Sequence, residues 1–413
     1  MTASLKNTAP SPFGISPKMA RALTDSWRVR ILAELSVHPM SPSQFVEEVG
    51  GELTHISRCF RQLAAWGYIE VQEERVGRRG GAAIEHVYRG IQRAHFDTAT
   101  WENVPRSGRH AVSRAAVGSY LARISEAVSA RTFDEEIDRH LSWDAVALDR
   151  AAWLRLGEHL DEVLERLPEL AVESDKRSKG SKTLIPTIVG LAAFRSPQSP
   201  LSMLQASRFH QSPPALGKGE VDFAFGPAMA KALSNNWRCR ILLELTHRPL
   251  SPSRFVEEIG GSMTHISRCF RELAKLGLIE IFEERKGGRR GGGVERIYRC
   301  LRRPYFDTAT WETLPRLVRE EMSQSFLTSY VERVVEAMEG GTFDAEADRH
   351  FSWKPVMLDG TAWEEVGEHL NEILGRLPHL EHESVERCAE IEDLIPTVVG
   401  LASFRSASRR RED

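Results

Sequence analysis

The stretch that decides the fold is THISRCFRQLAAWGYIE at residues 54–70, which returns as THISRCFRELAKLGLIE at residues 264–280. Apolar side chains at Ile56, Phe60 and Leu63 follow the i, i+4, i+7 spacing of one helix face. A glycine then ends the helix in both stretches, and two apolar residues before a glutamate begin a strand. The sequence therefore predicts a helix with one buried face, followed directly by a β-strand.

This similarity extends over most of the chain. Residues 13–196 recur at 223–406 with a constant offset of 210 and no insertion, and 18 of the 23 positions in 41–63 are identical in 251–273. Solenoid repeats are much shorter, roughly 20–50 residues. We therefore expect two copies of one folded unit, paired within the chain as an intramolecular pseudo-dimer. Duplex DNA with two similar half-sites is the commonest partner with matching symmetry.

The residues before the quoted stretch predict two further helices. One begins after Pro17, and the next begins at Ser41-Pro42-Ser43-Gln44, where a serine cap, a proline and a glutamine form a capping box. Gly50-Gly51 should end this second helix, and Thr54 should cap the third. A strand from Tyr68 and a return strand over 84–91 then flank a basic, glycine-rich loop.

Helix, helix, turn, helix and hairpin is the order of a winged helix-turn-helix. The predicted fold class is mainly α with small β-hairpins (α+β), with two winged helix-turn-helix domains that are each followed by a helical C-terminal module. The expected boundaries are 13–95 and 96–196 for copy 1, 197–226 for a Pro- and Ser-rich linker, and 227–305 and 306–406 for copy 2.

The C-terminal modules show helices flanked by short strands. A helix near 106–130 has Val117, Leu121, Ile124 and Val128 on one face, and this face is either the seam between the copies or part of its own module's core. A second helix should be capped by Asp149 and end at Pro168. Strands are expected at 145–148 and 187–194.

Within each copy, basic residues predominate in the N-terminal part and acidic residues in the C-terminal part. The whole chain has a net charge of −3, but residues 18–95 hold 11 Lys/Arg against 9 Asp/Glu, and residues 228–305 hold 16 against 8. The nets are +2 and +8, whereas 96–196 and 306–406 carry −2 and −13. Local patches set the field that a polyanion meets, so the basic N-terminal parts suit nucleic acid. The 41% hydrophobic content is enough for several cores.

The N-terminus is polar, no apolar run could span a membrane, and the five cysteines lack a CxxC spacing. These features favour a reduced, cytoplasmic setting with no membrane partner.

The outward face of the quoted helix carries short polar and basic side chains. Arginine can donate two hydrogen bonds to guanine, and serine, threonine or histidine reach bases or phosphates in a major groove. An ordinary solvated helix face is the alternative. The candidate DNA-binding residues in this helix and its second copy are Thr54, His55, Ser57, Arg58, Arg61, Thr264, His265, Ser267, Arg268 and Arg271.

The hairpin loop adds Arg78 and Arg79 in copy 1, with Arg289 and Arg290 in copy 2. Glycines beside them allow close backbone approach, so the arginines can follow phosphates or enter a minor groove. A nucleotide-binding phosphate loop is excluded because no Gly-Lys-Ser/Thr follows and the next element is a strand. A merely solvated loop is the remaining alternative.

The run Ile56-Ser57-Arg58-Cys59-Phe60-Arg61-Gln62-Leu63, closed by Gly67-Tyr68-Ile69-Glu70, resembles the recognition helix of bacterial ArsR-like winged-helix transcription regulators. The resemblance covers about 18–95 and 228–305, and it implies sequence-directed DNA binding as a dimer. Two departures stand out. The family's metal sensors carry a cysteine pair early in this helix, where this chain has only Cys59 at a core-like position. The family's chains are also usually single-copy.

Other residue patterns are weaker indications of a functional site. Asp138 and His140, with His159 on the next helix, could bind a metal or a polar effector, but a structural role is the simpler interpretation. The only candidate catalytic residues for an enzyme in the C-terminal modules are the acids Asp134, Glu135, Glu136 and Asp138. His379, His382 and Cys388 lack counterparts in copy 1.

We therefore expect a sequence-specific regulator that binds double-stranded DNA, with no catalytic residues, no metal and no cofactor, and a small-molecule effector left open. The alternatives are a nucleoid-type or RNA-binding protein without sequence choice, or an enzyme that uses the winged helices for docking.

Overall fold

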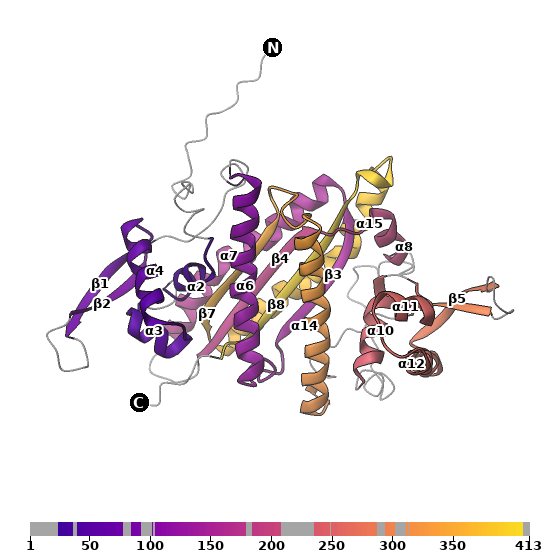
Figure 1. Ribbon diagram of the computed structural model, residues 1–413, viewed down its shortest axis with the longest axis horizontal. Helices are drawn as coiled ribbons and strands as arrows, with labels where there is room; N and C mark the ends of the chain where they lie inside the picture. Colours follow the sequence, from indigo (N-terminus) through magenta and orange to yellow (C-terminus); the bar gives the residue numbers. More distant parts are fainter. Residues whose placement is uncertain are drawn as a thin grey trace, which may run out of the picture.

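The computed structural model of the chain describes residues 24–35, 39–76, 84–91, 101, 104–178, 184–207, 235–247, 249–286, 294–301, 311–312 and 314–407. This part of the chain combines helices with antiparallel sheets, which confirms the α+β class at that level. None of the helices within these ranges is both long and apolar enough to cross a membrane. Figure 1 shows two small end units on either side of a larger central unit.

Each end unit packs helices against a two-stranded hairpin. End unit 1 (residues 24–91) comprises α2 (Ser26–Leu35), α3 (Pro42–Val49), α4 (Leu53–Ala65), β1 (Ile69–Val76) and β2 (Ile84–Gly90). End unit 2 (residues 235–301) comprises α10 (Asn236–His247), α11 (Pro252–Glu258), α12 (Met263–Lys275), β5 (Ile279–Lys286) and β6 (Val294–Cys300).

The predicted capping box of α3 is confirmed. The Gln44 backbone N–H donates to Ser41 Oγ at 3.2 Å, and the Ser41 N–H donates to Gln44 Oε1 at 3.0 Å. Helix α3 ends where expected, because Gly50 has a φ of 96° that favours glycine.

The predicted Thr54 cap is wrong. After the glycine turn the Ile56 N–H already donates to the Glu52 carbonyl at 2.9 Å, so α4 begins at Leu53 and Thr54 is exposed in its first turn.

A chain of aromatic rings holds α4 in place. Phe60 of α4 contacts Phe45 of α3 at a centroid distance of 5.8 Å and Tyr88 of β2 at 5.3 Å. The equivalent distances in end unit 2 are 5.9 and 5.3 Å. The apolar face of α4 is therefore fixed between the second helix and the hairpin, as its spacing predicts.

The central unit is built from both copies. Copy 1 supplies α6 (Arg106–Ser129), β3 (His140–Leu148), α7 (Arg150–Arg177), β4 (Ile185–Arg195) and α8 (Pro200–Ser207). Copy 2 supplies α14 (Arg316–Glu339), β7 (His350–Leu358), α15 (Gly360–Arg387), the 3₁₀ turn η1 (Ile391–Asp393) and β8 (Ile395–Arg405).

The strands of the two copies alternate in one four-stranded antiparallel sheet of order β3-β8-β4-β7. Each copy's first strand pairs with the other copy's second strand, and no described strand of this sheet pairs with a neighbour in its own copy. In the central pair Leu191 lies opposite Leu401, its own counterpart, so a pseudo-two-fold axis passes between these residues. Neither copy's central elements can form this sheet alone.

The two faces of the sheet are covered by different helix pairs. Val189, Leu191 and Ala193 face a core with α7 and α15, whereas the alternate residues Ile188 and Ala192 face a core with α6 and α14. This period of two is expected of a strand that is buried on both faces. Helices α6 and α14 cross the front of the sheet in Figure 1.

The predicted end of α7 at Pro168 is wrong. The helix runs to Arg177 with Pro168 inside it, and α15 contains Pro378 in the same way. Proline removes one backbone hydrogen bond, but buried Leu167 and Leu170 anchor the helix on both sides of the proline.

The predicted linker, 197–226, is also not linker throughout. Helix α8 lies within it, and Met203 and Leu204 are buried against Ala147 of β3 and Leu394. The remainder from 208 onward lies outside the described residues.

The stripe at Val117 and Ile124 of α6 turns out to serve both of its predicted roles. These side chains share a buried cluster with Leu327 and Val334 of α14, and this cluster covers the joint sheet. The pairing of strands between the copies was not predicted from the sequence. The packing of α6 against α14 adds to this joint sheet.

Buried ion pairs attach the end units to the central unit. Arg30 of α2 donates to Glu126 of α6 at 2.7 and 2.5 Å, and Arg123 lies 3.2 Å from Glu34. In copy 2, Arg333 donates to Glu244 at 3.0 Å. Because an unpaired buried charge is costly, these pairs fix the orientation of α2 on α6 and of α10 on α14.

Candidate nucleic-acid interface

Helix α4 presents the predicted polar face to solvent. Thr54, Arg58 and Arg61 are exposed, and His55 and Ser57 are half-buried at the edge of the face. The opposite side is closed, because Ile56 and Phe60 are fully buried with Cys59 and Leu63. The structure therefore brings all five predicted residues of this helix onto one side.

Helix α12 repeats this arrangement in end unit 2. Thr264, His265, Arg268 and Arg271 are exposed, and Ser267 is half-buried. Arg271 Nε donates to the Ser267 carbonyl at 3.2 Å, as Arg61 donates to the Ser57 carbonyl at 3.3 Å. The second arginine of each face is thus held along the helix, with the rest of its guanidinium at the surface.

The first arginine of the face differs between the copies. Arg268 Nε donates to Glu272 at 2.8 Å, and Glu272 also accepts from Arg238 at 2.8 Å. The hydrogen bonds from Arg268 and then Arg238 lower the pKa of Glu272 below its usual value. This carboxylate therefore holds Arg268 against its own helix.

Gln62 occupies the equivalent position in copy 1, where its Oε1 accepts from Arg28 at 3.0 Å. In the described part of the chain Arg58 forms no ion pair. This asymmetry was not predicted, although Gln62 and Glu272 are among the five differences between 41–63 and 251–273.

The hairpins carry charge pairs along their strands. Arg75 pairs with Glu73 at 2.7 Å, and Arg285 pairs with Glu283 at 2.8 Å, so the arginines at the base of each loop are already neutralised. The predicted wing residues Arg78, Arg79, Arg289 and Arg290 lie outside the described residues.

The Asp138, His140 and His159 pattern does not form a metal site. The described residues that gather as metal ligands do not include them. His140 is buried, its Nε2 lies 2.7 Å from Ser142 Oγ, and burial first and Arg139 second lower its pKa to about 3. These features fit the structural interpretation.

The arginine within the same motif joins the copies. The Arg139 guanidinium lies over the Trp311 ring of the other copy at 4.7 Å, and Arg349 lies over the Trp101 ring at 5.1 Å. The acidic residues beside it are also engaged: Glu135 and Glu136 lie 3.1 and 2.9 Å from Arg405. Both carboxylates are therefore held in ion pairs.

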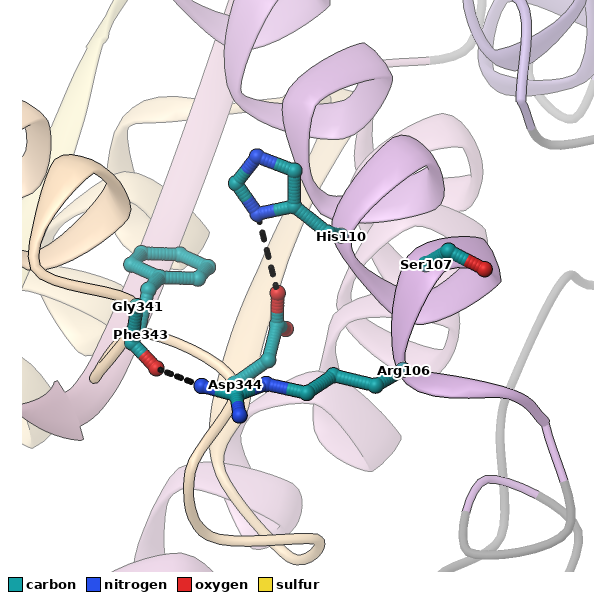
Figure 2. A pocket seen from close by; sticks show the side chains of 6 residues that line it. All are labelled: Arg106, Ser107, His110, Gly341, Phe343 and Asp344. Atoms are coloured by element: carbon teal, nitrogen blue, oxygen red, sulfur yellow. Dashed lines mark hydrogen bonds and ion pairs between the residues drawn. The ribbon is translucent and has the colours of Figure 1, made fainter.

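A small pocket lies between the start of α6 and the turn after α14, as Figure 2 shows. Its most buried polar group, Asp344, accepts from Ser113 at 2.5 Å and Arg349 at 2.6 Å, and His110 is 4.0 Å away. Arg106 donates to the Gly341 carbonyl at 3.3 Å. Most of its polar groups thus have partners within the protein.

One cluster in end unit 1 was missed. Asp25, His55 and Cys59 place one ligand atom each within 4.8 Å of the others. Two of the three could have been found from the sequence, because His55 and Cys59 are four residues apart on one helix. Asp25 joins them only through the packing of α2 beside α4.

Comparison of the chain with models of protein families, with curated proteins and with solved structures found no match.

Proposed function

We propose that the chain is a sequence-specific double-stranded DNA-binding transcription regulator that acts as a single-chain pseudo-dimer. Each end unit is a winged helix-turn-helix in which α4 or α12 enters a major groove. The hairpin tips contact the backbone or a minor groove. The ArsR-like resemblance of the recognition helix belongs to this proposal, as do a bacterial origin and a cytoplasmic setting.

The observation that carries the proposal is the pair of matched helix faces on one shared core. Helices α4 and α12 display the same Thr-His-x-Ser-Arg-x-x-Arg pattern to solvent. The central sheet has a pseudo-two-fold axis between Leu191 and Leu401, and matched ion pairs, Arg30–Glu126 and Arg240–Glu332, join the two end units to it. A dimer that reads two half-sites requires two such helices in a fixed relation.

The order of the helices and strands within each end unit supports the same function. In each end unit a capped helix, a glycine turn and an amphipathic helix are followed by an antiparallel hairpin. The aromatic chain through Phe60 or Phe270 locks the helix without using its outward side chains. The arginines of this face lie at the surface, where they are available to a ligand.

Charge supports a polyanionic ligand. Lys/Arg exceed Asp/Glu in residues 18–95 and 228–305, with nets of +2 and +8, whereas residues 96–196 and 306–406 carry nets of −2 and −13. This arrangement favours DNA at the N-terminal part of each copy, most strongly in copy 2, and repels it from the C-terminal parts.

The proposal is tested by binding of the full chain to duplex DNA enriched from a random library. Arg58→Ala should cost about 1–3 kcal/mol on the enriched duplex and change little on random duplex. Arg114→Ala, which removes the same charge from an exposed position of α6, is the matched control and should change neither.

Equal loss on both duplexes for Arg58→Ala would reject base reading. It would leave the alternative of a nucleoid-type or RNA-binding protein, which binding to random duplex and to RNA would then separate.

A further inference from the structure

The strongest unassigned feature is the cluster of Asp25, His55 and Cys59 beneath the N-terminal half of α4. His55 Nε2 lies 3.6 Å from Cys59 Sγ and 3.8 Å from Asp25 Oδ2. Imidazole, thiolate and carboxylate are the three usual ligands of zinc. Zn–N and Zn–S bonds of about 2.1 and 2.3 Å at a tetrahedral angle separate the ligand atoms by about 3.6 Å. The His55–Cys59 distance matches this value.

Each ligand is positioned by the fold. Asp25 Oδ1 caps α2 by accepting the Trp27 N–H at 2.9 Å and the Arg28 N–H at 3.2 Å, which fixes the carboxylate and turns Oδ2 toward His55. Cys59 is 2% exposed on the inner side of α4. His55 lies one turn earlier, with its side chain 39% exposed.

We propose that end unit 1 binds one borderline divalent transition-metal ion, of which zinc is the type, through Asp25, His55 and Cys59. A water molecule or an external ligand completes the tetrahedron on the open side.

The protonation of Cys59 and the charges near it determine how readily the ion binds. Burial first and Asp25 second raise the pKa of the Cys59 thiol to about 11, so the ion must displace a proton to bind the thiolate. Arg28 and Arg58 lower this pKa and oppose the ion's charge. Arg28 Nη1 donates to Gln62 at 3.0 Å and its guanidinium lies 5.3 Å from the Trp66 ring, while Nη2 lies 3.9 Å from Asp25 Oδ2, an ion pair that a bound cation replaces.

End unit 2 is a built-in control. His265 Nε2 and Cys269 Sγ are 3.7 Å apart, but Asn235 replaces the aspartate, and its Oδ1 accepts the Arg238 N–H at 3.1 Å. A neutral amide is a poor ligand for a borderline ion. The repeat therefore has a complete three-ligand set in one copy and a two-ligand set in the other.

The test is titration of the reduced full chain with Co²⁺, followed by displacement with Zn²⁺. We expect one equivalent of Co²⁺ with a thiolate-to-cobalt charge-transfer band. Cys59→Ser should remove the band, and Cys269→Ser should leave it. Asp25→Asn should weaken Co²⁺ binding about tenfold or more; it keeps the helix cap, because asparagine serves at the equivalent Asn235. Asn235→Asp should raise the stoichiometry to two.

A missing band in the parent chain overturns the proposal. So does a band that is lost with Cys269→Ser, or one that Asp25→Asn leaves at full affinity. If Cys59→Ser unfolds the chain, Asp25→Asn and Asn235→Asp still decide the outcome.

A consequence for DNA rests on the proposed function. His55 belongs to the DNA-facing side of α4, so an ion bound to its Nε2 fixes the ring and changes the charge at one half-site only. Zn²⁺ should therefore alter the DNA affinity of a chain with Arg268→Ala, whose binding depends on copy 1, and not that of a chain with Arg58→Ala, whose binding depends on copy 2. The cobalt titration contains no DNA, so it stands if DNA binding fails.

Discussion

Replacing Gly190 with alanine places a methyl group against the ring of Tyr120. Gly190 lies in β4, and a Cβ atom there would be 2.5 Å from Tyr120 Cζ and 2.7 Å from Cε2. Ordinary contacts begin near 3.4 Å, so the ring must move by close to 1 Å. Tyr120 is buried between Phe351 and Phe404 of the other copy, at centroid distances of 6.1 and 6.5 Å.

The expected cost follows from this enclosure. Overpacking a core costs about 1–3 kcal/mol, and a ring that is enclosed by other rings belongs at the upper end, about 3 kcal/mol. Urea denaturation of the full chain, followed by far-ultraviolet circular dichroism, measures the free energy of unfolding. Gly157→Ala in α7 is the control, because its Cβ meets nothing within 4 Å. It should stabilise the chain by about 0.5–1 kcal/mol.

A double-mutant cycle separates the clash from other effects. Tyr120→Ala alone should cost about 3–5 kcal/mol by leaving a cavity. Added to Gly190→Ala, it should cost less than the sum of the two single changes by at least about 1 kcal/mol. Strict additivity, or a Gly190→Ala chain as stable as the parent, would show that α6 does not pack on the joint sheet as described.

Three further predictions concern the interface and pH. Glu272→Gln releases Arg268 and removes a negative charge, so it should strengthen DNA binding about two- to fivefold, whereas Gln62→Glu should weaken it; an anisotropy titration in which both changes act alike would contradict this. Replacing the four wing-tip arginines should flatten the salt dependence of DNA affinity, and an unchanged slope would remove the wings from the interface. Burial lowers the folded-state pKa of His140 to about 3. The free energy of unfolding should therefore fall as pH falls from about 6.5 toward 3, by up to about 1.4 kcal/mol per pH unit, because the unfolded state binds a proton that the folded state does not. His140→Gln should reduce this slope, and an unaltered pH profile of urea midpoints would show that another group dominates.

The elements whose cause lies within a few residues could be predicted from the sequence. The capping box at Ser41 and the apolar face of α4 are local patterns, and the structure contains both. Thr54 was misplaced as a cap because the glycine turn starts the helix two residues earlier, with Glu52 at the cap position. Pro168 was misplaced as a helix end because burial on both sides of a proline outweighs one missing hydrogen bond.

Features that depend on contacts between residues far apart in the chain could not be predicted from the sequence. The strands at 145–148 and 187–194 were expected and lie within β3 and β4, but no local pattern states that β3 pairs with β8 rather than β4. The outward face of α4 followed from helical periodicity. The approach of Asp25 to Cys59 required the packing of two helices, so the candidate metal site was missed.

The most direct test of the central claim is selection of the full chain's preferred sequence from a random duplex library, followed by measurement of affinity for the selected and random duplexes at one salt concentration. Two equivalent helices on a pseudo-symmetric core predict a selected site with two similar half-sites, and a preference for it of about 10³-fold or more over random duplex. A library that emerges without enrichment, or equal affinity for both duplexes, would contradict sequence-specific recognition by α4 and α12.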